Sequence, residues 1–148
     1  MVRPLRAAGH LLYLPNELGV GGQDDESHLV TSTKLGAVLV TINQRDFQPL
    51  HHKWQADVQK HSGILLCQRL ETGDLFRRLD RAARLFTPEA SYNQLMTLSL
   101  FQADDEARNY VTSLTSWPLP RCRSAPTPGP LSLIRVSSSP LARWRGAR

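Results

Sequence analysis

Acidic and amide side chains follow a short apolar run in the first third of the chain. The run Ala37–Thr41 precedes Asn43 and Asp46, and Asp25 lies sixteen residues before Thr41. Carboxylate oxygens are the ligands that Mg²⁺ and Mn²⁺ prefer. A metal held by two or more carboxylates lowers the pKa of a bound water and stabilises the transition state of phosphodiester hydrolysis. If folding brings these side chains together, they predict a metal-dependent phosphodiesterase.

Other catalytic chemistries lack their residues in this sequence. It contains no P-loop, no Ser-His-Asp set and no cluster of zinc ligands. The two cysteines, Cys67 and Cys122, do not make a disulfide framework, and Cys67 lies in an apolar run typical of a buried position. His51 and His52 lack cysteine partners at a metal-binding spacing, so we interpret them as a solvated turn. His61 opens an apolar run and is interpreted as structural.

The acids must be positioned by an alternation of strands and helices. Apolar runs of strand length, one of them typical of a strand buried on both faces, alternate with segments of helical periodicity. Thr87 followed by Pro88 marks the start of one helix. The expected strands are 10–14, 37–41 and 62–67, and the expected helices are 25–34, 74–86, 88–100 and 106–114. A loop is expected after Thr41, with Asp46 near its tip. This order predicts an α/β domain with a parallel sheet, in which sites gather at the carboxyl ends of the strands.

Basic charge is concentrated at the end of the chain. Residues 117–148 hold six arginines, no acidic residue and six of the ten prolines, whereas residues 1–116 carry 12 basic and 13 acidic side chains, a net charge of −1. Because proline removes backbone donors and blocks helices, 117–148 is predicted to be a disordered tail. We interpret this tail as a non-functional extension, with a basic RNA-binding arm as the alternative.

The arginines of one expected helix and the length of the apolar runs bear on possible RNA and membrane partners. The helix expected at 74–86 carries four arginines on one side, which we interpret as a solvated face, with an RNA-binding groove as the alternative: Arg77, Arg78, Arg81 and Arg84. No run approaches the ~20 apolar residues of a membrane-spanning helix. We therefore expect a cytoplasmic protein with no membrane partner.

A resemblance to a known family lies in the segment Val38-Leu-Val-Thr-Ile-Asn-Gln-Arg-Asp-Phe47. Read as T-x-N-x-x-D-F, this segment resembles the strand-and-loop motif of PIN-like domains. Flanking segments resemble the end of that family's first helix, its second acidic motif, its H-x-G-I strand and its closing helix, at 5–10, 25–29, 61–64 and 89–100. The likeness covers residues 3–115 and is closest to the compact PIN-like group related to toxin–antitoxin ribonucleases.

The resemblance implies a three-layer α/β/α domain over residues 1–116 that cleaves RNA with Mg²⁺ or Mn²⁺. Asp25 and Asp46 match acidic positions and would bind the metal, with Glu26 a weaker candidate beside Asp25. Asn43 stands where many relatives have an aspartate and would orient a metal-bound water. Thr41 would hydrogen-bond a carboxylate or water at the strand end. The implied partners are RNA, an antitoxin protein and, in a homodimer, a second copy of the chain.

The amino-terminal end departs from the family pattern. A PIN-like domain begins with an apolar strand ending in an aspartate, whereas this chain begins near the end of the following helix. We therefore expect the central first strand and its aspartate to be missing, two strand edges to be exposed, and nuclease activity to be weak or absent. The alternative is a non-catalytic PIN-like remnant that only binds a partner or has no function. A response-regulator-like domain also fits the element order, but the sequence lacks its acidic cluster after a first strand.

Overall fold

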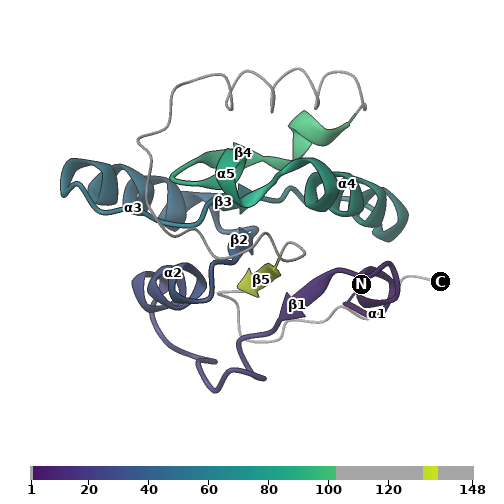
Figure 1. Ribbon diagram of the computed structural model, residues 1–148, viewed down its shortest axis with the longest axis horizontal. Coiled ribbons are helices and arrows are strands. Elements are labelled where there is room, and N and C mark those ends of the chain that lie inside the picture. Colours follow the sequence, from purple (N-terminus) through teal and green to yellow (C-terminus); the bar gives the residue numbers. More distant parts are fainter. Residues whose placement is uncertain (1, 103–131, 137–148) are drawn as a thin grey trace.

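Among the described residues, five parallel strands form a sheet between two layers of helices (Figure 1). The computed structural model describes residues 2–102 and, as backbone, residues 132–136. The order across the sheet is β1-β5-β2-β3-β4. The strands are β1 Leu11–Tyr13, β2 Val38–Thr41, β3 Ile64–Leu66, β4 Leu95–Thr97 and β5 Ser132–Val136; the helices are α1 Val2–Ala7, α2 Asp25–Lys34, α3 Gln44–Ala56, α4 Thr72–Leu85, α5 Pro88–Ser91 and the 3₁₀ helix η1 Leu98–Phe101. The predicted α/β class with a parallel sheet is confirmed.

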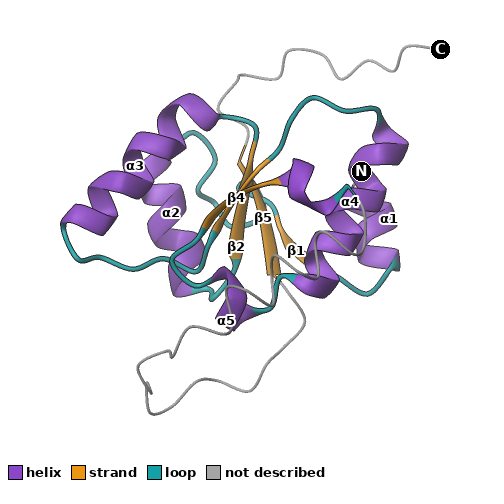
Figure 2. Cartoon of the chain, turned by 90° about the horizontal axis from the view of Figure 1, so that it is seen from above, coloured by secondary structure: helices purple, strands orange, loops and turns teal. Residues whose placement is uncertain are grey.

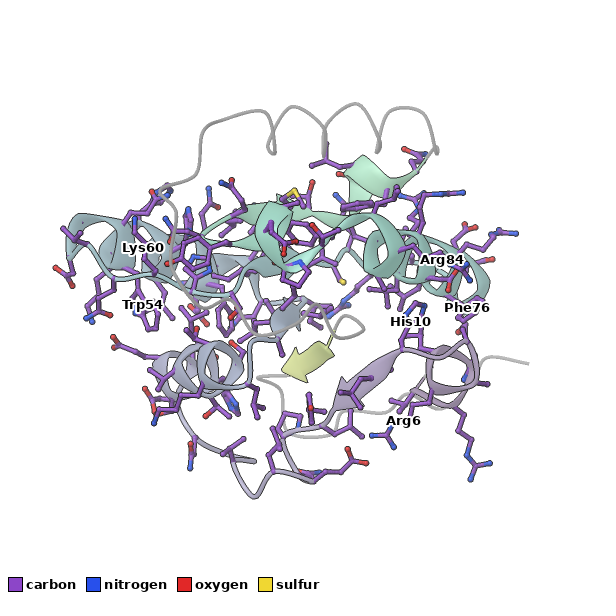
Figure 3. All side chains as sticks on the ribbon, viewed as in Figure 1. Arg6, His10, Trp54, Lys60, Phe76 and Arg84 are labelled. Atoms are coloured by element: carbon purple, nitrogen blue, oxygen red, sulfur yellow. The ribbon has the colours of Figure 1, made fainter. Side chains whose placement is uncertain are left out.

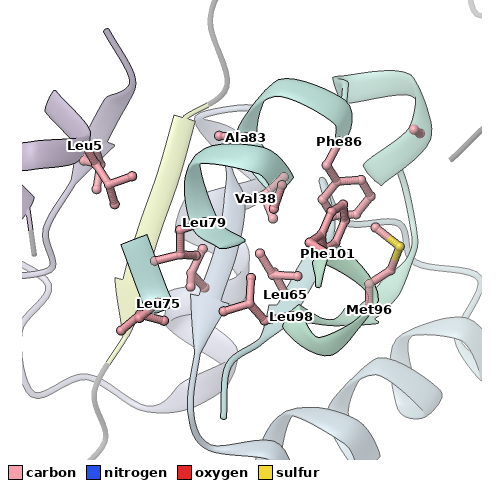
Figure 4. Packing of buried hydrophobic residues seen from close by; sticks show 14 residues of the cluster. Leu5, Val38, Leu65, Leu75, Leu79, Ala83, Phe86, Met96, Leu98 and Phe101 are labelled. Carbon is pink, nitrogen blue, oxygen red and sulfur yellow. The ribbon is translucent and has the colours of Figure 1, made fainter. Parts of the chain in front are cut away.

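The side chains of β2 alternate between two apolar cores. Val38 and Val40 face a core shared with α1, α4 and η1, whereas Leu39 faces a second core shared with α2 and α3. Figure 2 shows α2 and α3 on one side of the sheet and α1 and α4 on the other, and Figure 4 shows the first core around Phe86 and Phe101. Because both faces are covered, all four residues of β2 are buried, as the continuous apolar run predicted.

The strand in the middle of the sheet comes from the far end of the chain. β5 pairs in parallel with β1 and with β2, so that Leu133 lies opposite both Leu12 and Val38. The predictions that the sheet lacks a central strand and that 117–148 lies outside the fold are therefore wrong at 132–136. Two strand edges that face each other supply the hydrogen-bonding partners that an isolated tail lacks. The rest of the predicted tail and the predicted helix at 106–114 lie outside the described residues.

Helix α3 replaces the loop that was predicted after β2. Asp46 lies in the first turn of this helix, and His51 lies on its buried face and not in a solvated turn. Pro49 obscured the helix in the sequence, because proline lacks the N–H that would bond the carbonyl four residues earlier. The spacing of Phe47, His51 and Trp54 at i, i+4 and i+7 is the signal that places one face of the helix against the core.

The predicted helix at 88–100 is wrong beyond its first turn. α5 begins as expected, with the Ala90 amide donating to the Thr87 hydroxyl at 3.3 Å, but it ends at Ser91. Asn93 then adopts a left-handed backbone conformation with a φ of 56°, which stops a right-handed helix. The chain turns into β4 because the open edge of β3 offers it a parallel partner.

The remaining predicted elements are confirmed. β1, β3, α2 and α4 lie within their predicted ranges or within two residues of them. The apolar face of α4 is buried as its helical spacing predicted, through Leu75, Leu79 and Ala82. In the part of the chain that the structure describes, no helix has the length and apolar character needed to cross a membrane.

Val58, just after α3, is a strained and exposed residue. Its φ of 58° lies in the left-handed region, which disfavours β-branched side chains, and the side chain is 77% exposed. Its amide and the next one bond back to the carbonyls of Gln55 and Trp54, which is the pattern in which helices usually end on glycine. We expect Val58→Gly to raise the free energy of unfolding by about 1 kcal/mol, measured by urea denaturation.

Val58→Ala is the matched control for this change. It removes the exposed apolar side chain but keeps a Cβ in the left-handed conformation. We expect a smaller gain than with glycine. Equal stability of the two variants would show that the backbone at this position is not strained.

Candidate functional site

Three polar side chains meet at the carboxyl edge of the sheet. Asp25 opens α2, Asn43 follows β2, and Asp46 lies in the first turn of α3. The side-chain amide nitrogen of Asn43 donates to Asp46 Oδ2 at 2.6 Å and to Asp25 Oδ2 at 3.4 Å. The structure therefore brings together the two acids and the amide that the sequence pattern selected.

Thr41 shapes the turn from which Asn43 projects. Its hydroxyl accepts a hydrogen bond from the backbone amide of Asn43 at 3.0 Å, and its side chain is buried at the end of β2. Its carbonyl accepts from the amide of Cys67 at 2.7 Å, which ties the end of β2 to β3. Thr41 thus acts on the site through the backbone amide of Asn43.

Burial and repulsion both raise the pKa of Asp25. Desolvation is the largest cause, and the charge of Asp46 adds to it, whereas the nearby His28 acts in the opposite direction. A raised carboxyl pKa means that the negative charge is poorly compensated in the folded protein. A cation bound to Asp25 and Asp46 would compensate this charge, so the electrostatics of the pair favour metal binding.

His28 belongs to this region, although the sequence pattern did not single it out. It is 5% exposed, and its Nδ1 has no hydrogen-bond partner among the residues that the structure describes. It lies one turn after Asp25 and next to Leu29, on the face of α2 that also buries Ser32. The spacing of these four residues at i, i+3, i+4 and i+7 is the sequence signal that identifies the buried face.

Glu26, the weaker metal-ligand candidate beside Asp25, accepts hydrogen bonds from side chains of α3. Lys53 Nζ donates to its carboxylate at 3.0 Å and Trp54 Nε1 donates at 3.3 Å. The bond from Lys53, followed by the bond from Trp54, lowers the pKa of Glu26. Glu26 therefore joins α2 to the helix that carries Asp46 and is not part of the acidic pair.

The residues at this edge fit a divalent cation only in part. Asp25 and Asp46 offer oxygen ligands from two elements, and the amide of Asn43 can offer a third oxygen after rotation. Among the described residues, however, no group of three or more His, Cys, Asp or Glu side chains is arranged to hold a metal ion. β5 adds no acid, because Val136 is the residue opposite Thr41 and 132–136 contain neither Asp nor Glu.

Arg77, Arg81 and Arg84 of α4 make polar contacts within the fold. Arg77 pairs with Asp74, and Arg84 donates to Asp80 at 3.0 Å. Arg81 donates to the last carbonyl of η1 at 2.8 Å. Because acids of the same helix compensate two of these charges, the contacts favour the solvated-face interpretation over an RNA-binding groove.

Asp80 also anchors the start of β1 to α4. His10 Nε2 lies 2.7 Å from Asp80 Oδ1, and Figure 3 shows His10 and Arg84 at one end of the molecule, far from Trp54 at the other. Burial raises the pKa of Asp80, but the bonds from His10 and Arg84 outweigh this effect, so the pKa is lowered. His10 precedes β1 and thus lies at the amino edge of the sheet, opposite the acidic site, where its bond to Asp80 is structural.

Comparisons with known families, curated proteins and solved structures found no match to this chain. The likeness to PIN-like domains therefore rests on the motif at 41–47 and its flanks. What this likeness implies about activity is a proposal about the acidic edge formed by Asp25, Asn43 and Asp46.

Proposed function

We propose that this chain is a PIN-like ribonuclease that uses Mg²⁺ or Mn²⁺ held by Asp25 and Asp46, with low turnover. The observation that carries the proposal is the Asn43 amide bonded to two carboxylates of separate helices at the carboxyl edge of a parallel sheet. This edge is where α/β domains place their ligands. Low turnover follows from the number of acids, since two carboxylates fix a cation less firmly than three.

In this proposal each residue of the edge has a separate task. Asp25 and Asp46 hold the cation, which when bound supplies a water of lowered pKa and positive charge near the phosphate. Asn43 positions both carboxylates through its amide, and Thr41 fixes the turn that carries Asn43. RNA is the proposed substrate, an antitoxin protein is the proposed neutralising partner, and a homodimer is the proposed assembly.

RNA cleavage by the full chain in the presence of Mn²⁺ tests this proposal. We expect slow cleavage that EDTA abolishes and that Asp46→Asn lowers at least about 10-fold, because one of two charged ligands is lost. Asp57→Asn is the matched control, since Asp57 is an exposed carboxylate at the other end of the same helix. Asn43→Asp adds a third carboxylate and is expected to raise the rate. Equal cleavage by the unchanged chain and by Asp46→Asn would sink the metal role of Asp46.

A non-catalytic binding module is the second candidate function. The sequence of β5 favours this candidate. β5 ends beside Thr41 at the acidic edge, but it contains no Asp or Glu that could complete a metal site. A binding module would retain RNA without cutting it, and Asn43→Asp would leave the RNA intact in Mn²⁺. Tight Mn²⁺ binding by the unchanged chain, lost in Asp46→Asn, would count against this candidate.

A further inference from the structure

A buried pair of histidines joins the middle of α3 to the start of β3. His51 Nδ1 lies 2.8 Å from His61 Nε2, and the two rings meet edge to face with centroids 5.0 Å apart. His61 is fully buried, and His51 is 6% exposed. The pair lies outside the acidic site, and the proposed function makes no use of it.

Hydrogen bonds determine where each neutral ring carries its proton. The backbone N–H of Gly63 donates to His61 Nδ1 at 3.1 Å, so this nitrogen is an acceptor and the proton of His61 lies on Nε2. His61 Nε2–H in turn donates to His51 Nδ1, which leaves the proton of His51 on its own Nε2. The donors therefore run in one direction, from the Gly63 amide through both rings.

A proton added to either ring disrupts this arrangement. Protonated His61 would direct a second N–H at the N–H of Gly63. Protonated His51 would direct an N–H at the Nε2–H of His61. In both cases two donors face each other in a buried place, where an unpaired donor is unfavourable.

The surroundings of the pair also oppose protonation. Burial is the largest cause that lowers the pKa of His61 from its ordinary 6.5 to about 4, followed by the charges of its partner ring and of Lys60. Burial also lowers the pKa of the partner ring, with His52 as the second cause. Two further groups that meet His61 are uncharged: the indole of Trp54, 6.1 Å away between ring centroids, and the backbone amide of Asn93, which donates to the His61 carbonyl.

The pair is placed where it can act on the acidic site. His51 shares the buried face of α3 with Phe47 and Trp54, and Asp46 immediately precedes this face in the first turn. Separation of α3 from β3 would therefore move Asp46 away from Asp25. The bond between the two rings is a polar tie between this helix and the sheet.

We propose that the His51–His61 pair is an acid-sensitive latch on α3. When neutral, it holds α3 against the start of β3; when protonated, it opens, and α3 leaves the sheet together with Asp46. In the open state His61 takes up a proton below pH 6.5, whereas in the closed state it does so only below about 4. The closed state is therefore fully favoured above pH 6.5 and loses this advantage as the pH falls from 6.5 toward 4. The latch does not depend on whether the acidic site cleaves RNA.

Amide hydrogen exchange of the full chain at pH 7.5 and pH 5.0 tests the latch. After correction for intrinsic exchange rates, we expect the protection of α3 against exchange to fall about 30-fold more than that of α4 when the pH is lowered. This factor follows from the difference between the pKa of His61 in the open state, 6.5, and in the closed state, about 4. α4 is the internal control, because it packs on the opposite face of the sheet. An equal fall in both helices, or no fall in α3, would overturn the proposal.

His61→Asn and His52→Asn form the matched pair of variants. Asparagine at 61 keeps an acceptor for the Gly63 amide but takes up no proton, so we expect most of the selective fall in α3 to disappear. His52→Asn removes an exposed imidazole from the same helix and should keep the selective fall. If His61→Asn does not fold, the imidazole ¹⁵N shifts of the unchanged chain decide instead. A His61 proton found on Nδ1 at pH 7.5 would overturn the arrangement on which the latch rests.

Discussion

Ile134→Pro is expected to lower the free energy of unfolding by at least about 3 kcal/mol, a large share of the ~5–15 kcal/mol of a typical domain. Ile134 lies opposite Tyr13 in β1 and opposite Leu39 in β2, so its strand is paired on both edges. Proline removes a backbone donor and is excluded from strands in the middle of a sheet. Without β5, β1 has no neighbour in the described sheet. Urea denaturation followed by far-ultraviolet circular dichroism measures the loss.

Ser124→Pro is the control for this substitution. It adds one more proline to the segment 118–130, which already holds five, and lies outside β5. We expect a change within about 0.5 kcal/mol, because this substitution leaves the pairing of β5 with β1 and β2 unchanged. If Ile134→Pro were as stable as Ser124→Pro, the segment 132–136 would not fill the middle of the sheet.

Gly63→Ala is expected to lower the free energy of unfolding by about 3 kcal/mol or more. Gly63 has a φ of 120°, a conformation that other residues rarely adopt. A Cβ at this position would lie 2.6 Å from the carbonyl oxygen and 2.9 Å from the Cβ of Ser91, which is itself buried. Strain and overlap therefore add to each other at the entry to β3. The melting temperature and the urea midpoint should both fall.

Gly21→Ala is the matched control for the change at Gly63. Its added Cβ would overlap with the far end of the Asn16 side chain, which can rotate away, and its φ is not in the left-handed region. We expect little change in stability. Similar losses at Gly21 and Gly63 would contradict the close approach of β3 to α5.

Much of the fold and the acidic site could be predicted because both depend on local patterns. The β-branched run before Thr41 predicted a strand buried on both faces, and β2 is that strand. Asp25 and Asp46 were selected because they stand near the ends of elements that a parallel sheet brings to one edge, and the Asn43 amide bonds both of them. The elements α3, β4 and β5 were not predicted from the sequence. α3 was hidden by Pro49, and β4 and β5 depend on partner strands remote in the sequence.

The sequence by itself determined β1, β2, β3 and α2, the apolar face of α4, and the identity of the acids, because these follow from periodicity and residue type. Only the tertiary structure decided that 132–136 become the central strand and that His51 meets His61. An apolar segment of strand length can stay extended, continue a helix or pair with a sheet. The choice depends on whether an open strand edge lies beside it, and that edge exists only after distant segments have packed. The same holds for a histidine, whose protonation depends on which donor or acceptor the folded chain brings to each ring nitrogen.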